Sequence, residues 1–438
     1  MKTICLYFEI HQLIHLKRYR FFDIGTDHYY YDDYANETSI TGIAENSYIP
    51  ALRTLIDMVR ESQGVFKVAL SLSGVGLEQL ERYAPQVIDL LQELAGTGCC
   101  EFIAAPYSHG LSSLAPNGEA CFREETKRLV EKVNQLFGQR PKVFCNSNMI
   151  YDDEIGSLVA DMGFKGILTE GASHILGWKS PHYLYHCVLN PSLKVFTRDY
   201  KLSDDISLRF SNPSWESYPL MADTYADWIA SSPEEDGVFS ICMELCALGI
   251  YQPLSSHVLD FLRSLPEQCR QRGIGFATPS EVIRTHKSVS AVEVPYPMSW
   301  NDEERDISCW LGNVMQREAF EKLYSIGERV LLSGDRHLRQ DWDYLQASNN
   351  LRFMTTKNNA VSMDRGIYES PYDAFTNYMN ILGDFMQRVN WALPQDMELE
   401  ELNAFQTTIR NQDKKIQSLE KQVARLKSAQ VTKKEPRK

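Results

Sequence analysis

The feature that most constrains the fold of this chain is a repeated alternation of short apolar runs with longer amphipathic stretches. The short runs have strand-like composition, whereas the stretches between them, such as 77–94 and 122–136, carry apolar residues at helical spacing. Strand, helix and strand repeated in this way predict a parallel sheet with crossover helices. With this many runs before residue 285, a barrel is favoured over an open sheet. The predicted strands are residues 3–10, 66–72, 101–104, 142–145, 166–169, 194–197, 238–243 and 275–277.

The strand pattern ends near residue 288, and helical periodicity continues from 303 to about 389. We therefore expect a β/α barrel over residues 1–287, a helical domain over 288–393, and a separate C-terminal segment over 394–438. Within that segment, apolar residues of 402–426 recur at spacings of three and four, which predicts a coiled coil and a homo-oligomer. The alternative is one amphipathic helix folded back onto the helical domain.

Charge and hydropathy argue against several classes of protein. The chain has 45 Lys and Arg against 58 Asp and Glu, a net charge of −13, which argues against binding to nucleic acid or to an anionic membrane surface. No apolar run is long enough to cross a bilayer, and the apolar N-terminus is interrupted by Glu9 and too short for a signal sequence. The 10 cysteines lack the spacing of a disulfide framework, so we expect reduced thiols and a cytoplasmic protein.

Two pairs of histidines are spaced four residues apart, His11 with His15 and His182 with His186. On a helix such a pair can share a metal ion, but neither pair has the adjacent carboxylate of a metalloprotease motif. We therefore expect no metal site and no cofactor. A metal-dependent polysaccharide deacetylase, the alternative for a barrel of this kind, would need such a site and a supporting aspartate, which the sequence does not identify.

In β/α barrels the chemistry takes place where strands end and loops begin. Glu244 is the only charged residue within 238–252, and a carboxyl group there would be partly desolvated, which suits a general acid. The alternative is a structural glutamate paired with an arginine such as Arg209. His11 directly follows the first predicted strand, and residues at this position often belong to the active site of such a barrel. Four tryptophans could stack on sugar rings, although a single tryptophan more often belongs to a core: Trp178, Trp215, Trp300 and Trp310.

Several spaced motifs carry a family resemblance. His11-Gln12-Leu13 is similar to a His-Gln-Pro motif after a first strand, and residues 299–313 are very similar to a signature of a helical domain. Further matching motifs are residues 71–75, 77–80, 169–171, 180–183, 202–206, 209–210 and 218–220. On these motifs the chain resembles the α-amylase-like branch of glycoside hydrolase family 57 over about residues 1–395. The resemblance implies a retaining enzyme acting on α-glucans, with an incomplete seven-stranded β/α barrel followed by a helical domain.

The resemblance also assigns positions in the site. Residues 146–151, Asn-Ser-Asn-Met-Ile-Tyr, align with a family motif of the form Asn-Thr-Glu-Leu-Ile-Tyr. Asn148 therefore takes the position of the family's nucleophilic glutamate. Glu244 takes the position of the acid/base aspartate, although a rival register with an insertion would place Cys242 there. By motif position, four further residues would contact sugar: His11, His109, Trp300 and Asp302.

The departures from the family motifs decide the functional expectation. A retaining mechanism needs two carboxyl groups about 5 Å apart, and the neutral amide of Asn148 cannot form a glycosyl ester. The extra methylene of Glu244 shifts its carboxyl group by about 1.5 Å, and small misplacements of this kind are costly. We expect a catalytically impaired protein that retains a groove for α-glucan or malto-oligosaccharide.

Two alternatives stay open. The first is an active α-glucan hydrolase or glucanotransferase in which a relocated base works with Glu244, and the candidates are Asp152, Asp153 and Glu170. A substrate with its own neighbouring nucleophile would be another way to replace the lost group. The second alternative is an oligomeric assembly protein that acts through its coiled coil, with the barrel as an inert scaffold.

Overall fold

The structure is a computed structural model that describes residues 2–357, 366–393 and 412. Seven parallel strands follow one another around a ring. They are β1 (Thr3–Ile10), β2 (Val68–Leu72), β3 (Cys100–Ile103), β4 (Val143–Cys145), β5 (Gly166–Glu170), β7 (Lys194–Arg198) and β8 (Val238–Glu244), which pairs with β1 again. The joins of β3 to β4 through Ala104 and Phe144, and of β7 to β8 through Arg198 and Ser240, are single bridges. The predicted incomplete seven-stranded β/α barrel is thereby confirmed.

Alternation along the strands decides which side chains point into the barrel. All eight residues of β1 are buried, as expected for a parallel strand covered on both faces. Tyr7 of β1 and Cys242 of β8 belong to the inner core, whereas Phe8 packs against the surrounding helices. The same parity directs Glu9 and Glu244, two residues further along, toward the inside of the barrel at the carboxyl ends of the strands.

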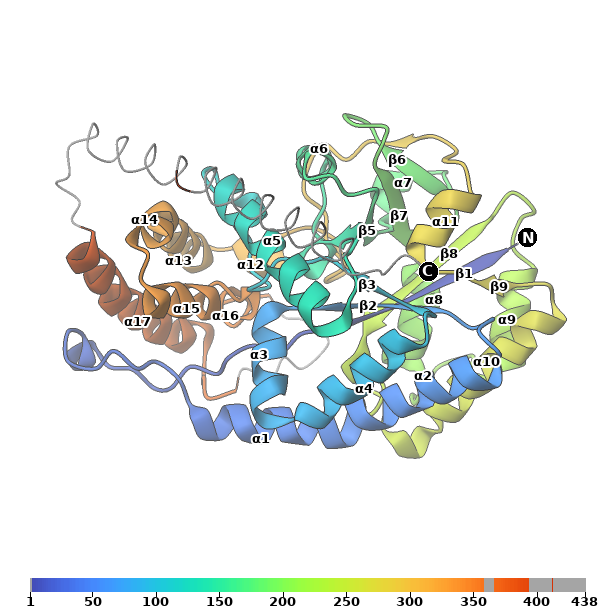
Figure 1. Cartoon of the computed structure of the whole chain (residues 1–438), viewed down its shortest axis with the longest axis horizontal. Coiled ribbons are helices and arrows are strands. Elements are labelled where there is room, and N and C mark those ends of the chain that lie inside the picture. The colour runs from blue at the N-terminus through green and yellow to red at the C-terminus, as the bar shows by residue number, and fades with distance from the viewer. Residues whose placement is uncertain (1, 358–365, 394–411, 413–438) are drawn as a thin grey trace, which may run out of the picture.

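Helices cover the outside of the barrel (Figure 1). The amphipathic stretch 77–94 is helical and is divided into α3 (Gly74–Tyr83) and α4 (Pro85–Gly96). Pro85 lacks an N–H group and restricts the residue before it, and Ala84 accordingly has an extended φ of −145°. The other main helices around the barrel are α1 (Asp33–Ile43), α2 (Ile49–Glu61), α5 (Glu119–Phe137), α6 (Asp153–Asp161), α9 (Ala222–Ala230), α10 (Val258–Gln271) and α11 (Pro279–Thr285).

Two strands were not expected from the sequence. β6 (Leu184–Cys187) runs antiparallel to β7, and β10 (Ala291–Val292) pairs with β6, although no strand was expected beyond residue 288. Both strands are short and stabilised by pairing with a neighbour, so local composition does not reveal them. The last predicted strand is present as β9 (Gly275–Phe276), which pairs with the start of β1.

A helical region follows the barrel and lies together on one side of it, at the left of Figure 1. Its helices share a core with one flank of the barrel, in which Trp310, Trp342 and Phe385 are fully buried. Trp310 is therefore a core residue. The helices are α12 (Ser308–Leu311), α13 (Val314–Ser325), α14 (Gly327–Ser333), α15 (Arg336–Leu345), α16 (Ser348–Arg352) and α17 (Pro371–Ala392).

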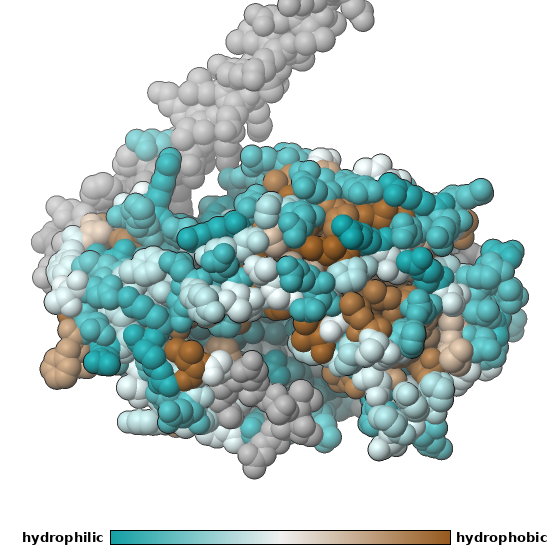
Figure 2. Space-filling view, turned by 90° about the horizontal axis from the view of Figure 1, so that it is seen from below, coloured by the Kyte–Doolittle hydropathy of each residue, from teal (hydrophilic) through white to brown (hydrophobic). Residues whose placement is uncertain are grey.

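The predicted coiled coil over 402–426 lies, except for Gln412, outside the residues that the structure describes, so it stays a prediction. The division into residues 1–287, 288–393 and 394–438 also stays a prediction. Within the described ranges, no helix is long and apolar enough to cross a membrane. All ten cysteines are buried. The face along which α1, α2 and α10 lie is mainly hydrophilic, with hydrophobic residues gathered in patches (Figure 2).

Candidate active site

Two glutamates lie next to each other where β1 and β8 end. The two strands are paired so that Glu9 stands opposite Glu244 in register. Glu9 is only 6% exposed, and its carboxyl oxygen lies 3.1 Å from Nε2 of His109. Burial raises the pKa of Glu9 to about 7. Glu244 accepts a hydrogen bond of 2.7 Å from the hydroxyl group of Tyr251 and a weaker one of 3.3 Å from the thiol of Cys246.

His11 and His109 form the second part of the site. Their rings are stacked with centroids 3.9 Å apart and an interplanar angle of 12°. Nδ1 of His11 lies 2.8 Å from the hydroxyl oxygen of Ser73, and its Nε2 lies 3.1 Å from the amide oxygen of Asn349. Burial lowers the pKa of His109 to about 4, and burial together with the nearby His109 lowers that of His11 well below its usual range. Both rings are therefore neutral at pH 7 and act through hydrogen bonds rather than charge.

Asn148 lies at the end of β4, in a tight turn over Ser147–Met149. Its φ of 55° is left-handed, a conformation that asparagine adopts more readily than most residues. The side chain is 8% exposed, and its amide nitrogen donates a hydrogen bond of 3.0 Å to the hydroxyl group of Ser348. That hydroxyl oxygen lies 3.3 Å from Nδ1 of His109. The position predicted for the nucleophile is therefore connected through α16 and His109 to Glu9.

Trp300 and Asp302 come from the segment that leads into the helical region. The backbone N–H of Trp300 donates to the carbonyl oxygen of Asn148 at 3.2 Å, and the ring packs against the inner core of the barrel. The carboxylate of Asp302 lies 3.5 Å from Nζ of Lys357 and contacts the thiol of Cys309. The structure therefore brings Trp300 to Asn148, whereas Asp302 is engaged by its own neighbours.

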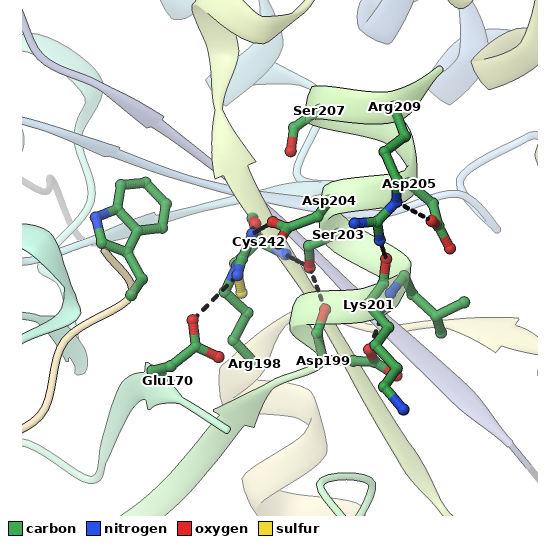
Figure 3. A network of polar contacts seen from close by, with 12 residues as sticks. Glu170, Arg198, Asp199, Lys201, Ser203, Asp204, Asp205, Ser207, Arg209 and Cys242 are labelled. Atoms are coloured by element: carbon green, nitrogen blue, oxygen red, sulfur yellow. Dashed lines mark hydrogen bonds and ion pairs between the residues drawn. The ribbon is translucent and has the colours of Figure 1, made fainter. Parts of the chain in front are cut away.

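Glu170, one of the predicted substitute bases, belongs to a buried ionic network (Figure 3). Arg198 is 4% exposed and lies between Glu170 and Asp204. Its guanidinium group donates to Glu170 at 3.0 Å, to the carboxylate of Asp204, and to the carbonyl oxygen of Cys242 at 2.8 Å. A second arginine, Arg305, lies 3.3 Å from the same oxygen of Glu170. The carboxylate of Glu170 is thus in ion pairs with two guanidinium groups.

The other two predicted bases hold backbone groups. Asp152 caps α6 by accepting a hydrogen bond of 2.7 Å from the N–H of Ile155. Asp153 accepts one of 3.0 Å from the N–H of Val294. Arg209, the arginine considered as a partner for Glu244, instead donates to Asp205 at 2.7 Å.

The histidine pairs do not lie on helices. His11 and His15 follow β1 in irregular structure, and His186 belongs to β6. His182 lies between two carboxylates, 2.7 Å from Asp199 and 2.8 Å from Asp236. Across the described ranges, no group of three His, Cys, Asp or Glu side chains is arranged to hold a metal ion.

Sequence reasoning missed several of these partners. The sequence could have indicated Glu9, because it is the one charged residue of β1 and points to the same side of the strand as Tyr7. Nothing in the sequence indicated Ser348 and Asn349, because they lie in the helical region, far along the chain from the strand ends that they contact.

The comparisons with known proteins identify the family of the chain. The sequence profile of glycosyl hydrolase family 57 matches residues 5–295, and the chain belongs to this family. The family resemblance is thereby confirmed, and the deacetylase alternative is set aside. A putative α-amylase from Methanocaldococcus jannaschii is 36% identical over 370 residues, which cover 81% of this chain and 78% of that protein.

Solved structures of low sequence identity share the fold. The family 57 branching enzyme from Pyrococcus horikoshii has a TM-score of 0.61 at 15% identity, and the match covers 93% of this chain and 94% of the enzyme. The α-amylase AmyC from Thermotoga maritima has a TM-score of 0.55 at 11% identity and coverages of 90% and 98%. The 4-α-glucanotransferase from Thermococcus litoralis has a TM-score of 0.58 at 15% identity, and the match covers 80% of this chain but 56% of that protein.

Proposed function

We propose that this α-amylase-like member of family 57 binds α-glucan or malto-oligosaccharide at the barrel mouth and is strongly impaired in the family's double displacement. The observation that carries the proposal is Asn148. Its side chain is a neutral amide held by Ser348, and it provides no negative charge to attack an anomeric carbon. In the usual retaining mechanism a second carboxyl group is the nucleophile.

The contacts of the predicted substitute bases support the same proposal. Glu170 is held in ion pairs by Arg198 and Arg305, so its carboxylate already has two partners, while burial raises its pKa. Asp152 and Asp153 each accept a hydrogen bond from a backbone N–H group. All three carboxylates therefore have at least one partner, and one oxygen of Asp153 is buried without any.

The proposed sugar contacts are His11, His109, Trp300 and Asp302, with Glu244 and Asn148 at the former catalytic centre. The two neutral imidazoles suit uncharged hydroxyl groups, and the indole of Trp300 suits the apolar face of a pyranose ring. This assignment of contacts is part of the proposal and is independent of catalysis, so binding and turnover are measured separately.

Chromatographic product analysis with maltoheptaose tests the proposal. We expect no products from the wild type after long incubation and turnover by Asn148→Glu, which restores the family's carboxylate. Asn148→Gln is the matched control, because it has the same length without the charge, and it should stay inactive. Efficient turnover by the wild type would overturn the proposal that catalysis is impaired. Absence of maltoheptaose binding in calorimetry would overturn the proposal that the barrel mouth binds α-glucan.

One observation favours a second candidate function, an active α-glucan hydrolase with a relocated carboxyl group. Neighbouring strands lie about 4.8 Å apart, which is close to the separation of about 5 Å in a retaining pair, and Glu9 stands opposite Glu244. In that case the wild type should release products and Glu9→Gln should abolish them. Products that survive in Glu9→Gln would exclude this candidate.

A further inference from the structure

A groove of about 530 Å³ lies outside the candidate active site. One of its walls is α10 together with the residues just before it, and the other is the segment 210–223, which ends in the first turn of α9. None of the residues assigned to the barrel mouth lines this groove. Its volume falls within the range of about 300–1,000 Å³ that is usual for small-molecule sites.

The α10 wall carries a row of hydrogen-bonding side chains beside Phe261 and His257, and Nδ1 of His257 lies 2.8 Å from Asp260. Ser256, Asp260, Ser264 and Gln268 are spaced four residues apart, so the three on α10 lie on one face of the helix and Ser256 extends the row. The row combines hydroxyl, carboxylate and amide groups. The hydroxyl oxygen of Ser256 is buried and has no hydrogen-bond partner among the described residues. A buried hydroxyl group of this kind is unfavourable until a ligand or water supplies a partner.

The opposite wall is apolar and partly aromatic. It contains Phe210, Tyr218, Pro219, Leu220 and Met221. Tyr218 is 46% exposed and Met221 is 59% exposed, so large apolar groups line the groove while remaining accessible from solvent. The half-exposed ring of Tyr218 provides a stacking surface for a ligand, whereas Phe210 is buried beneath the wall.

One polar wall facing one aromatic wall matches the two kinds of surface on a pyranose ring. The apolar face of the ring packs against the aromatic side chain, and its hydroxyl groups bond to the polar row. Asp223 and Asp260 also line the groove, and their carboxylates disfavour an anionic ligand. We propose that this groove is a second carbohydrate-binding site that takes a stretch of α-glucan outside the barrel mouth. The choice of α-glucan rests on the proposed function.

The groove is connected to the candidate active site by hydrogen bonds of the loop after Glu244. Gln252, which lies in the loop after Glu244, accepts a hydrogen bond of 2.8 Å from the N–H of Ser211 and donates one of 2.8 Å to the carbonyl oxygen of Ser207. The same loop carries Tyr251, which donates to Glu244 and is 50% exposed. The wall of the groove is therefore fixed to the loop that ends at the barrel mouth.

Calorimetric titration of the full chain with maltoheptaose tests the proposal. We expect two sets of sites in the wild type. Ser264→Trp, which fills the groove from an exposed position, and Tyr218→Ala should each lose one set or weaken it at least fivefold. Trp300→Ala should instead lose or weaken the set of sites at the barrel mouth. Tyr34→Ala is the matched control, because Tyr34 is 80% exposed and does not line the groove, and it should retain both sets.

The outcomes separate the two proposals. If both groove variants fold and bind like the wild type, the second site is overturned, while loss of all binding in Trp300→Ala would leave the proposed function standing. If the groove variants lose all binding and Trp300→Ala loses none, the second site stands and the proposed site at the mouth fails. A wild type that binds no maltoheptaose would overturn both. Ser264→Trp keeps the test decisive if removal of Tyr218 impairs folding.

Discussion

Asn148 and His109 share one hydroxyl group, that of Ser348. The amide nitrogen of Asn148 lies 3.0 Å from the hydroxyl oxygen and Nδ1 of His109 lies 3.3 Å from it, while Nε2 of His109 lies 3.1 Å from Glu9. A neutral His109 can accept from Ser348 at Nδ1 and donate to Glu9 at Nε2. The chain of contacts therefore runs from the end of β4 to the end of β1 through a residue of the helical region.

Removing the shared hydroxyl group tests this chain. Ser348→Ala should lower the free energy of unfolding by about 1–3 kcal/mol, because it leaves the buried amide of Asn148 without its partner. Urea unfolding monitored by tryptophan fluorescence measures the change. Ser214→Ala, at an exposed position, is the control and should be neutral. Equal stability of the two variants would contradict the assigned hydrogen bonds.

The carboxyl group of Glu9 should make stability depend on pH. Because burial raises its pKa from 4.5 to about 7 in the folded state, its contribution is fully present below pH 4.5 and is lost as the pH rises through 7. Glu9→Gln keeps the hydrogen-bonding capacity without the titration and should be more stable than the wild type at pH 8 by roughly 3 kcal/mol. The free energy of unfolding in urea at pH 5 and pH 8 tests this. A difference between the two proteins that does not change with pH would be the contrary result.

His182 should contribute a second pH dependence. Burial opposes its protonation, but hydrogen bonds to Asp199 and Asp236 prevail and raise its pKa above 6.5. Its contribution to stability is therefore full below about pH 6.5 and is lost as the pH rises through the raised pKa. His182→Gln should remove this part of the profile. Urea unfolding of both proteins between pH 6 and pH 9 measures it, and parallel profiles would argue against a charged His182.

The ionic network around Arg198 predicts non-additive effects. Arg198→Met leaves the buried carboxylates of Glu170 and Asp204 without their main partner and should cost about 3–5 kcal/mol. Adding Glu170→Gln to Arg198→Met should recover part of that loss, because one unpaired charge is removed. Thermal unfolding of the single and double variants forms the cycle. Additive losses would show that the two side chains are energetically independent.

Self-association through 402–426 remains a prediction of the sequence. Removal of the chain after Pro394 should convert oligomers into monomers in sedimentation experiments. A finer test is Leu419→Asp, which places a charge on the predicted apolar seam, with Ser418→Asp as the control beside it. A truncated protein that keeps the oligomeric state of the full chain would exclude the coiled coil as its cause.

Much of the barrel could be predicted because its signals are local. Strand runs and amphipathic stretches each depend on side chains a few residues apart, and the predicted 3–10 and the observed β1 coincide. The errors arose where neighbours further away decide the outcome. β6 and β10 exist through their pairing with other strands.

The residues of the candidate site also fall into those that the sequence indicated and those that only the structure revealed. Motif positions identified Asn148, Glu244, His11 and His109, and the structure gathers three of these, with Glu9, into connected contacts. Motif positions did not reveal that Glu170 is neutralised by arginines or that Ser348 joins Asn148 to His109. Such contacts depend on which strand ends and helices meet in space.

The sequence by itself determined the family and the alternation of strands and helices in the barrel, because both depend on residues that are close together along the chain. Only the tertiary structure decided which groups are partners. Closure of the barrel sets Glu9 beside Glu244, and docking of the helical region brings Ser348 to Asn148. Burial in that assembled site then changes the protonation of Glu9 and His109, because desolvation depends on all the surrounding atoms and not on the neighbouring residues of the chain.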